Sequence, residues 1–312
     1  MSDTDDDRTA SLMTPAKLAQ LKARPQPAAS PAAWLDQLAS DAGSGHVRRL
    51  VELGQQLEAA VRGREGDFGP LGVACTALHD ALGQLDFSLV QPKGWLARAT
   101  GKGKEAAATF GKQHDRVLRV AEDLADDLKA LQKPSSASGG ADRMALEIEA
   151  EMRALEKIMD QGARWLQDMR NQLKARQTQG GDAAVQQQIR EDSARCELLV
   201  ARLKLLRDVN TAAQQALERT QAAAARRASV LAALAQWLDE DWKPARQRLE
   251  AVARKVEDEG AAAEGIEPSR RAVEALQPGL RQAHRDCGAV QATAQAASDA
   301  LAAMQGPLRA AA

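Results

Sequence analysis

Apolar residues recur at intervals of three and four over most of this chain, the spacing that places them on one face of an α-helix. The most regular run lies between residues 142 and 176. Its apolar stripe consists of Met144, Ile148, Met152, Leu155, Met159, Gly162, Leu166, Met169 and Leu173. A second stripe follows the polar stretch QTQGGDAA and consists of Val185, Ile189, Cys196, Leu199, Leu203, Leu206, Val209, Ala213, Leu217 and Thr220. Because the intervening turn is short, the two helices are predicted to fold back on each other as an antiparallel hairpin.

Further helices are predicted on both sides of this hairpin from their capping and breaking residues. Pro31 follows Ser30 at the start of one helix, and Ser44 is a predicted N-cap for the next. Pro244 is expected to start another, and the run KPSSASGGAD has the composition of a flexible linker. The predicted parts are a disordered tail over 1–30, an N-terminal helical region over 31–133, a long helical hairpin with a following helix over 141–256, and an Ala-rich C-terminal helix over 268–312.

Composition favours many thin helix–helix contacts over one thick globular core. Hydrophobic residues make up 44% of the 312-residue chain, but many of them are Ala, and aromatic residues make up only 3%. Ala, Leu, Arg, Gln and Glu are abundant, and these residues lose least on entering a helix. The predicted fold class is therefore all-α: an elongated helical bundle with long antiparallel, coiled-coil-like helices.

Three features of the sequence predict a cytoplasmic protein. The acidic start MSDTDDDRTA is followed by no apolar signal-peptide core, and no run approaches the roughly 20 apolar residues that a membrane span needs. The three cysteines, at 75, 196 and 287, are an odd number and do not form a disulfide framework.

A net charge of -1 gives no overall basic field, so no nucleic-acid partner is expected.

No segment carries a recognisable set of catalytic residues. The run GKGKEAAAT resembles a phosphate loop, but its glycines are wrongly spaced and no strand precedes it. His284 and Cys287 share one helix face, but zinc needs three or four ligands. The carboxylates from Glu122 to Asp127 have the spacing of a solvated helix face. We therefore expect no catalytic, cofactor-binding or metal-binding residues, and no enzyme activity.

The most unusual segment runs from Leu85 to Phe110, which gathers aromatic residues and glycines in a chain with three Phe, five Trp and no Tyr. From Lys93 to Arg119, seven cations outnumber two anions. On a helix, the aromatic residues would share a stripe that most of the cations avoid. Three interpretations remain open: a buried stripe with solvated cations, a docking site for an acidic protein, or a face that lies on an anionic membrane. The candidate partner-binding residues are Lys93, Trp95, Arg98, Lys102, Lys104 and Lys112.

The order of several sequence segments resembles one known family. The pieces are LDFS, PKGWL, TGKGKEAAATFGKQHDRV and ALEIEAEMRALEKIMDQGARWLQDMRNQL, then SARCELLVARLKLLRDVNTAAQQALERT and LAALAQWLDEDWKPARQRL. Over roughly residues 76 to 255 they look like the TelA family of bacterial toxic-anion (tellurite) resistance proteins. The resemblance implies a role in stress resistance, and it brings no catalytic residues with it.

Together these observations predict a non-enzymatic helical scaffold or adaptor in a bacterial stress-resistance system. A protein partner is expected. The alternative is a peripheral membrane-associated helical protein that uses the basic face over 93–112.

Overall fold

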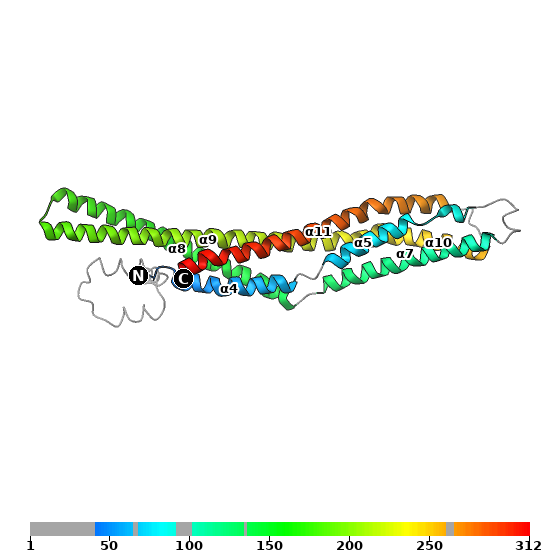
Figure 1. Cartoon of the computed structure of the whole chain (residues 1–312), viewed down its shortest axis with the longest axis horizontal. Helices are drawn as coiled ribbons and strands as arrows, with labels where there is room; N and C mark the ends of the chain where they lie inside the picture. Colours follow the sequence, from blue (N-terminus) through cyan, green and yellow to red (C-terminus); the bar gives the residue numbers. More distant parts are fainter. Residues whose placement is uncertain (1–40, 65–67, 92–101, 134–135, 260–264) are drawn as a thin grey trace, which may run out of the picture. The chain divides into compact units, whose positions relative to one another are not determined.

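The computed structural model describes residues 41–64, 68–91, 102–133, 136–259 and 265–312 (Figure 1). The regular elements in these ranges are all helical, which confirms the predicted all-α class. The elements are α4 (Ser44–Arg64), α5 (Phe68–Gly83), the 3-10 turn η1 (Phe87–Leu89), α7 (Lys102–Gln132), α8 (Ser136–Gln179), α9 (Ala183–Trp237), the π turn η2 (Leu238–Trp242), α10 (Lys243–Glu259) and α11 (Ile266–Ala311). The predicted tail over 1–30 and the helix expected from Pro31 lie outside the described residues.

The helices form two compact units, and neither is a continuous stretch of chain. Unit 1 contains α4, Ser136–Thr220 and Ala296–Ala312, whereas unit 2 contains Glu65–Ser135 and Gln221–Gln295. The expected divisions ran along the chain over 31–133, 141–256 and 268–312. The units cut across these divisions because α9 and α11, with 55 and 46 residues, each supply apolar residues to two cores.

In unit 1, α8 and α9 form the predicted antiparallel hairpin. Gly180, at φ +70°, ends α8, and the Asp182 carboxylate accepts a hydrogen bond from the Val185 amide to cap α9. Met159 and Leu203 both pack against the unit 1 core, as the hairpin requires. Gly162 permits this approach, because a Cβ atom there would lie only 2.9 Å from a Leu203 methyl group.

The linker predicted after Lys133 is largely absent, and this prediction was wrong. Helix α8 already begins at Ser136, so most of the Ser- and Gly-rich run is helical. Ala141 and Ile148 are buried in the unit 1 core and fix the helix just downstream. Extending a helix that packing has already nucleated costs far less than starting one. Weak helix formers can therefore be helical here.

Unit 2 is built from α5, α7 and α10 with the adjoining parts of α9 and α11. Its core includes Phe68, Leu78, Phe110, Leu249 and Leu280, each at most 2% exposed. Trp242 is also buried there.

The helix expected at Pro244 is present as α10, which begins at Lys243, but no break separates it from α9. Helix α9 continues through η2 directly into α10, and the Lys243 amide donates to the Leu238 carbonyl, five residues back. Proline lacks an N–H, and its ring crowds the carbonyl four residues earlier. One wider π turn accommodates that crowding without ending the helix.

Candidate functional site

The sequence-predicted basic face is only partly within the described residues. Lys93, Trp95 and Arg98 lie outside them, and Lys102 is the first residue of α7. Lys104 and Lys112 are exposed on α7, as expected. Three of the six candidate residues therefore lie on α7, and two of them, Lys104 and Lys112, have exposed side chains.

The apolar stripe of α7 is committed to the unit 2 core. Phe110 is fully buried, with its ring centroid 5.7 Å from that of Phe87. Asp86 caps the η1 turn that carries Phe87, and its amide donates to the Gln113 side chain of α7. The exposed surface of α7 is consequently polar, and its apolar side is already occupied.

Buried His114 is also part of this packing. Its Nε2 has no hydrogen-bond partner in the described structure, and its Nδ1 lies 3.7 Å from the Asp115 carboxylate. Burial lowers the pKa of His114, which outweighs the opposing influence of Asp115 and of Glu250 on α10. The ring is therefore held in its neutral form.

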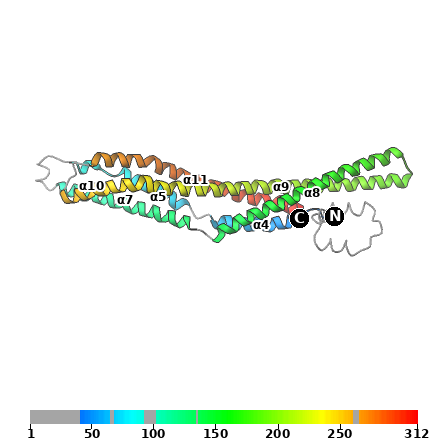
Figure 2. The same ribbon diagram turned by 180° about the vertical axis from the view of Figure 1, so that it is seen from behind.

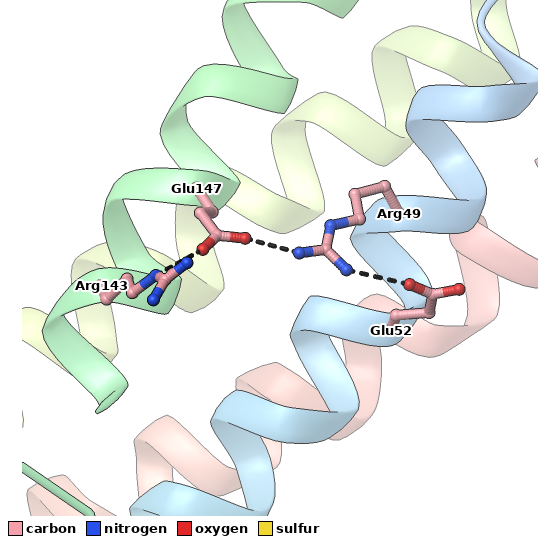
Figure 3. A network of polar contacts seen from close by, with 4 residues as sticks. All are labelled: Arg49, Glu52, Arg143 and Glu147. Atoms are coloured by element: carbon pink, nitrogen blue, oxygen red, sulfur yellow. Dashed lines mark hydrogen bonds and ion pairs between the residues drawn. The ribbon is translucent and has the colours of Figure 1, made fainter. Parts of the chain in front are cut away.

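A polar network ties α4 to α8 in unit 1 (Figure 3). Arg49 donates to Glu147 at 2.6 Å and to Glu52 at 3.0 Å, and Arg143 donates to the other oxygen of Glu147 at 3.0 Å. Hydrogen bonds from Arg49 and then Arg143 lower the pKa of Glu147. One turn along α8, Glu151 lies 2.6 Å from Nδ1 of His46 on α4. These partly exposed pairs set the alignment of α4 on α8.

Buried Arg202 connects α9 to the ends of two other segments of unit 1. Its Nε donates at 3.0 Å to the Ala42 carbonyl, just before α4, and one Nη donates to the carbonyl of Ala311 at the end of α11. The other Nη is buried without a partner in the described structure. Burial lowers the pKa of Arg202. The guanidinium thus supplies donors to a helix C-terminus, where cations are favoured.

A third polar tie lies near the turn of the α8–α9 hairpin. The Asp192 carboxylate on α9 is almost fully buried and accepts from Arg176 of α8 at 3.2 Å and from Arg195 at 3.1 Å. The hairpin residues nearest the turn are therefore held by a charged pair across the two helices as well as by Leu173 and Ile189.

Within the described residues, no three His, Cys, Asp or Glu side chains are grouped so that they could hold a metal ion. His284 instead has its Nδ1 3.0 Å from both the Gly72 carbonyl and the Thr76 hydroxyl of α5. None of the described helices combines the length and apolar character required to cross a membrane.

Comparison of this chain with family models, with curated proteins and with solved structures finds no match.

Sequence reasoning missed the polar ties that organise unit 1. Arg202 stands in a stretch of α9 rich in charged residues, and nothing in its local pattern separates it from exposed Arg207. The heptad phase does not separate them either, because Arg202 adjoins the stripe residue Leu203 and Arg207 adjoins the stripe residue Leu206.

Proposed function

We propose that the protein is a non-catalytic helical scaffold that presents the distal part of its α8–α9 hairpin to a protein partner. The distal hairpin consists of residues 164–179 of α8 and 183–201 of α9. The observation that carries the proposal is that, in unit 1, these two helices run past the ends of α4 and α11 (Figures 1 and 2).

The distal hairpin is stabilised by its own seam. Its buried apolar residues come from α8 and α9 alone and are Leu166, Met169, Leu173, Ile189, Cys196 and Leu199. A two-helix seam leaves most of each helix surface open to solvent. Leu198 is 60% exposed on this surface, and Val185 is 37% exposed. The hairpin thus offers a long, ordered surface with apolar positions among charged ones, a composition suited to protein contacts.

The buried polar side chains of unit 1 support a structural role. Arg202 binds two backbone carbonyls, and Asp192 is held by two arginines. These hydrogen bonds join α9 to α8, to the residue before α4 and to the end of α11, so they hold the helices of unit 1 together.

The resemblance to toxic-anion resistance proteins supports a place for this scaffold in tellurite or envelope stress resistance. That assignment rests on the order of the sequence segments and is tested separately from the scaffold role.

Electrostatic docking on a membrane has weaker support. Lys104, Lys112, Arg116 and Arg119 are exposed on α7, but the acidic residues from Glu122 onward follow on the same helix. Stable surface binding needs an apolar face to insert as well as cations. That face of α7 is buried in unit 2.

Site-specific photo-crosslinking in cells tests the scaffold role. A photoreactive amino acid is placed at exposed Gln172, Gln188 or Leu198 of the distal hairpin, and at exposed Ala108 of α7 as the matched control. We expect the hairpin positions to give one shared protein adduct that the Ala108 position does not give. The proposal would be overturned if the hairpin positions gave no adduct, or if the Ala108 position gave the same adduct in equal amount.

The stress role is tested in a strain that lacks the gene. Tellurite sensitivity should increase and return to normal with the intact protein, but not with a hairpin shortened by one heptad in each helix. Unchanged sensitivity in the deletion strain would reject the resistance role and leave the scaffold result standing.

A further inference from the structure

The cysteines of unit 2 form a pair in the folded chain, although they are far apart in sequence. Cys75 on α5 is 0% exposed and Cys287 on α11 is 2% exposed, and both belong to the unit 2 core. The third cysteine, Cys196, is buried in the separate core of unit 1. The three cysteines are thus one close pair in unit 2 and one single thiol in unit 1.

The backbones of α5 and α11 come close beside this pair. A Cβ atom added at Gly72, one turn before Cys75, would lie 3.4 Å from the Cβ of Cys287. On the same faces, His284 contacts the Gly72 carbonyl and the Thr76 hydroxyl, each at 3.0 Å. Because Gly72 has no side chain and His284 contacts two groups of α5, the two helices lie close together beside the two cysteines.

The two thiols hydrogen-bond each other. This contact raises the pKa of Cys75 far above its ordinary value, and burial adds to the increase. The same hydrogen bond lowers the pKa of Cys287. Of the two thiols, Cys287 is the one whose pKa is lowered, so its sulfur is the expected nucleophile.

From this juxtaposition we propose that Cys75 and Cys287 form a reversible disulfide that links α5 to α11 under peroxide stress. The Cys287 thiolate attacks hydrogen peroxide, forming sulfenic acid and releasing hydroxide. The Cys75 sulfur then attacks the Cys287 sulfur, an S–S bond forms, and the S–OH bond breaks. The proton lost from Cys287 combines with the hydroxide released from peroxide, and the Cys75 proton leaves with the hydroxide displaced from the sulfenic acid, so each forms one water. In total, two thiols and one peroxide give one disulfide and two waters.

Burial sets the selectivity of this reaction. A small neutral oxidant can reach the pair during brief local opening of unit 2, whereas bulky thiol reagents are excluded. Cys196 has no second thiol in its core and cannot form the same bond. It serves as an internal control in the native protein.

The test is peptide mapping of the full chain after peroxide treatment, acid quenching and alkylation under denaturing, non-reducing conditions. We expect the Cys75 and Cys287 peptides to be joined, with the mass of two hydrogen atoms lost, while Cys196 is alkylated. A thiol reductant should reverse the link. The Cys196→Ala protein should give the same link, and Cys75→Ala should abolish it.

The proposal is overturned if both cysteines remain alkylatable at a peroxide dose that oxidises the half-buried Met144 and Met159. It is also overturned if Cys287 in the unmodified sequence proceeds to sulfinic or sulfonic acid without linkage. Both results come from the native protein, so they do not depend on whether a cysteine variant folds.

Discussion

Arg202→Met is the most informative single substitution, because two large effects oppose each other at this site. The change keeps a long side chain but removes the positive charge and the donors to the Ala42 and Ala311 carbonyls. Removing a buried charge recovers part of its desolvation cost, which reaches several kcal/mol per ion. Removing the donors leaves two buried acceptors without partners, at about 1–3 kcal/mol each.

We expect the loss of the donors to dominate. One carbonyl belongs to a helix end, where a cation is favoured by the helix dipole as well as by the hydrogen bond. The recovered desolvation is smaller than for an isolated ion, because two of the three guanidinium nitrogens are already hydrogen-bonded. The net destabilisation of unit 1 should be about 2 kcal/mol.

Urea unfolding followed by circular dichroism measures this change. With a slope of about 1–3 kcal/mol per molar urea, the midpoint of the affected transition should fall by roughly 1 M while its slope stays the same. Hydrogen exchange should locate the weakening in α4 and at the end of α11, and leave α5 unaffected. The matched control is Arg207→Met at an exposed position of the same helix, which should change stability by under about 0.5 kcal/mol. An Arg202→Met protein that is as stable as the original, or more stable, would show that burying the charge costs more than the two carbonyl bonds contribute.

Four further substitutions have defined outcomes. A Cβ atom at Gly279 would lie 2.5 Å from Nε1 of Trp237, so Gly279→Val should lower the thermal midpoint by overpacking worth about 1–3 kcal/mol. Gly288 on the same helix has open space, and Gly288→Ala should instead stabilise α11 by about 1 kcal/mol in the same thermal scan. Because burial lowers the pKa of His114, the ring binds a proton more readily in the unfolded chain than in the folded protein. Stability of unit 2 should therefore fall as the pH drops below the unfolded value of about 6.5, and His114→Leu should flatten that part of the pH–stability curve. Arg49 and Arg143 lower the pKa of Glu147, so its contribution is present above the unfolded carboxyl pKa and disappears as the pH falls through the lower folded value. Glu147→Gln should give a small loss of stability at neutral pH and low salt that vanishes in high salt.

A different outcome would identify the faulty step in each case. Equal effects of the Gly279 and Gly288 substitutions would mean that Trp237 can move aside at no cost. An unchanged pH slope in His114→Leu would place the acid-sensitive group elsewhere. A salt-independent effect of Glu147→Gln would indicate packing in place of charge.

Local sequence signals predicted most of the helical architecture. The phase of Met159 and Leu203 and the Gly180–Asp182 turn were sufficient to predict the hairpin, because both are short-range features. The Ser- and Gly-rich run after Lys133 misled because tertiary packing around Ala141 overrides weak propensity.

The polar ties and the thiol pair could not be predicted in this way. Arg202 meets Ala42 and Ala311 across separations of 160 and 109 residues. Periodicity tells which face of a helix is buried but not which distant helix covers it. The pairing of Cys75 on α5 with Cys287 on α11 is long-range in the same way, so the sequence predicted no link between them.

Sharing α11 between the two units constrains how the protein is made. The core of unit 2 includes Val273 and Leu280, and the core of unit 1 includes Leu301 and Leu308, all on this one helix. During translation, α4, α5 and α7 are made well before α11. The parts of their apolar faces that pack on α11 therefore stay exposed until α11 is synthesised. The nascent chain should therefore depend on chaperone shielding until α11 is made. A chain that ends before α11 would lack residues of both cores.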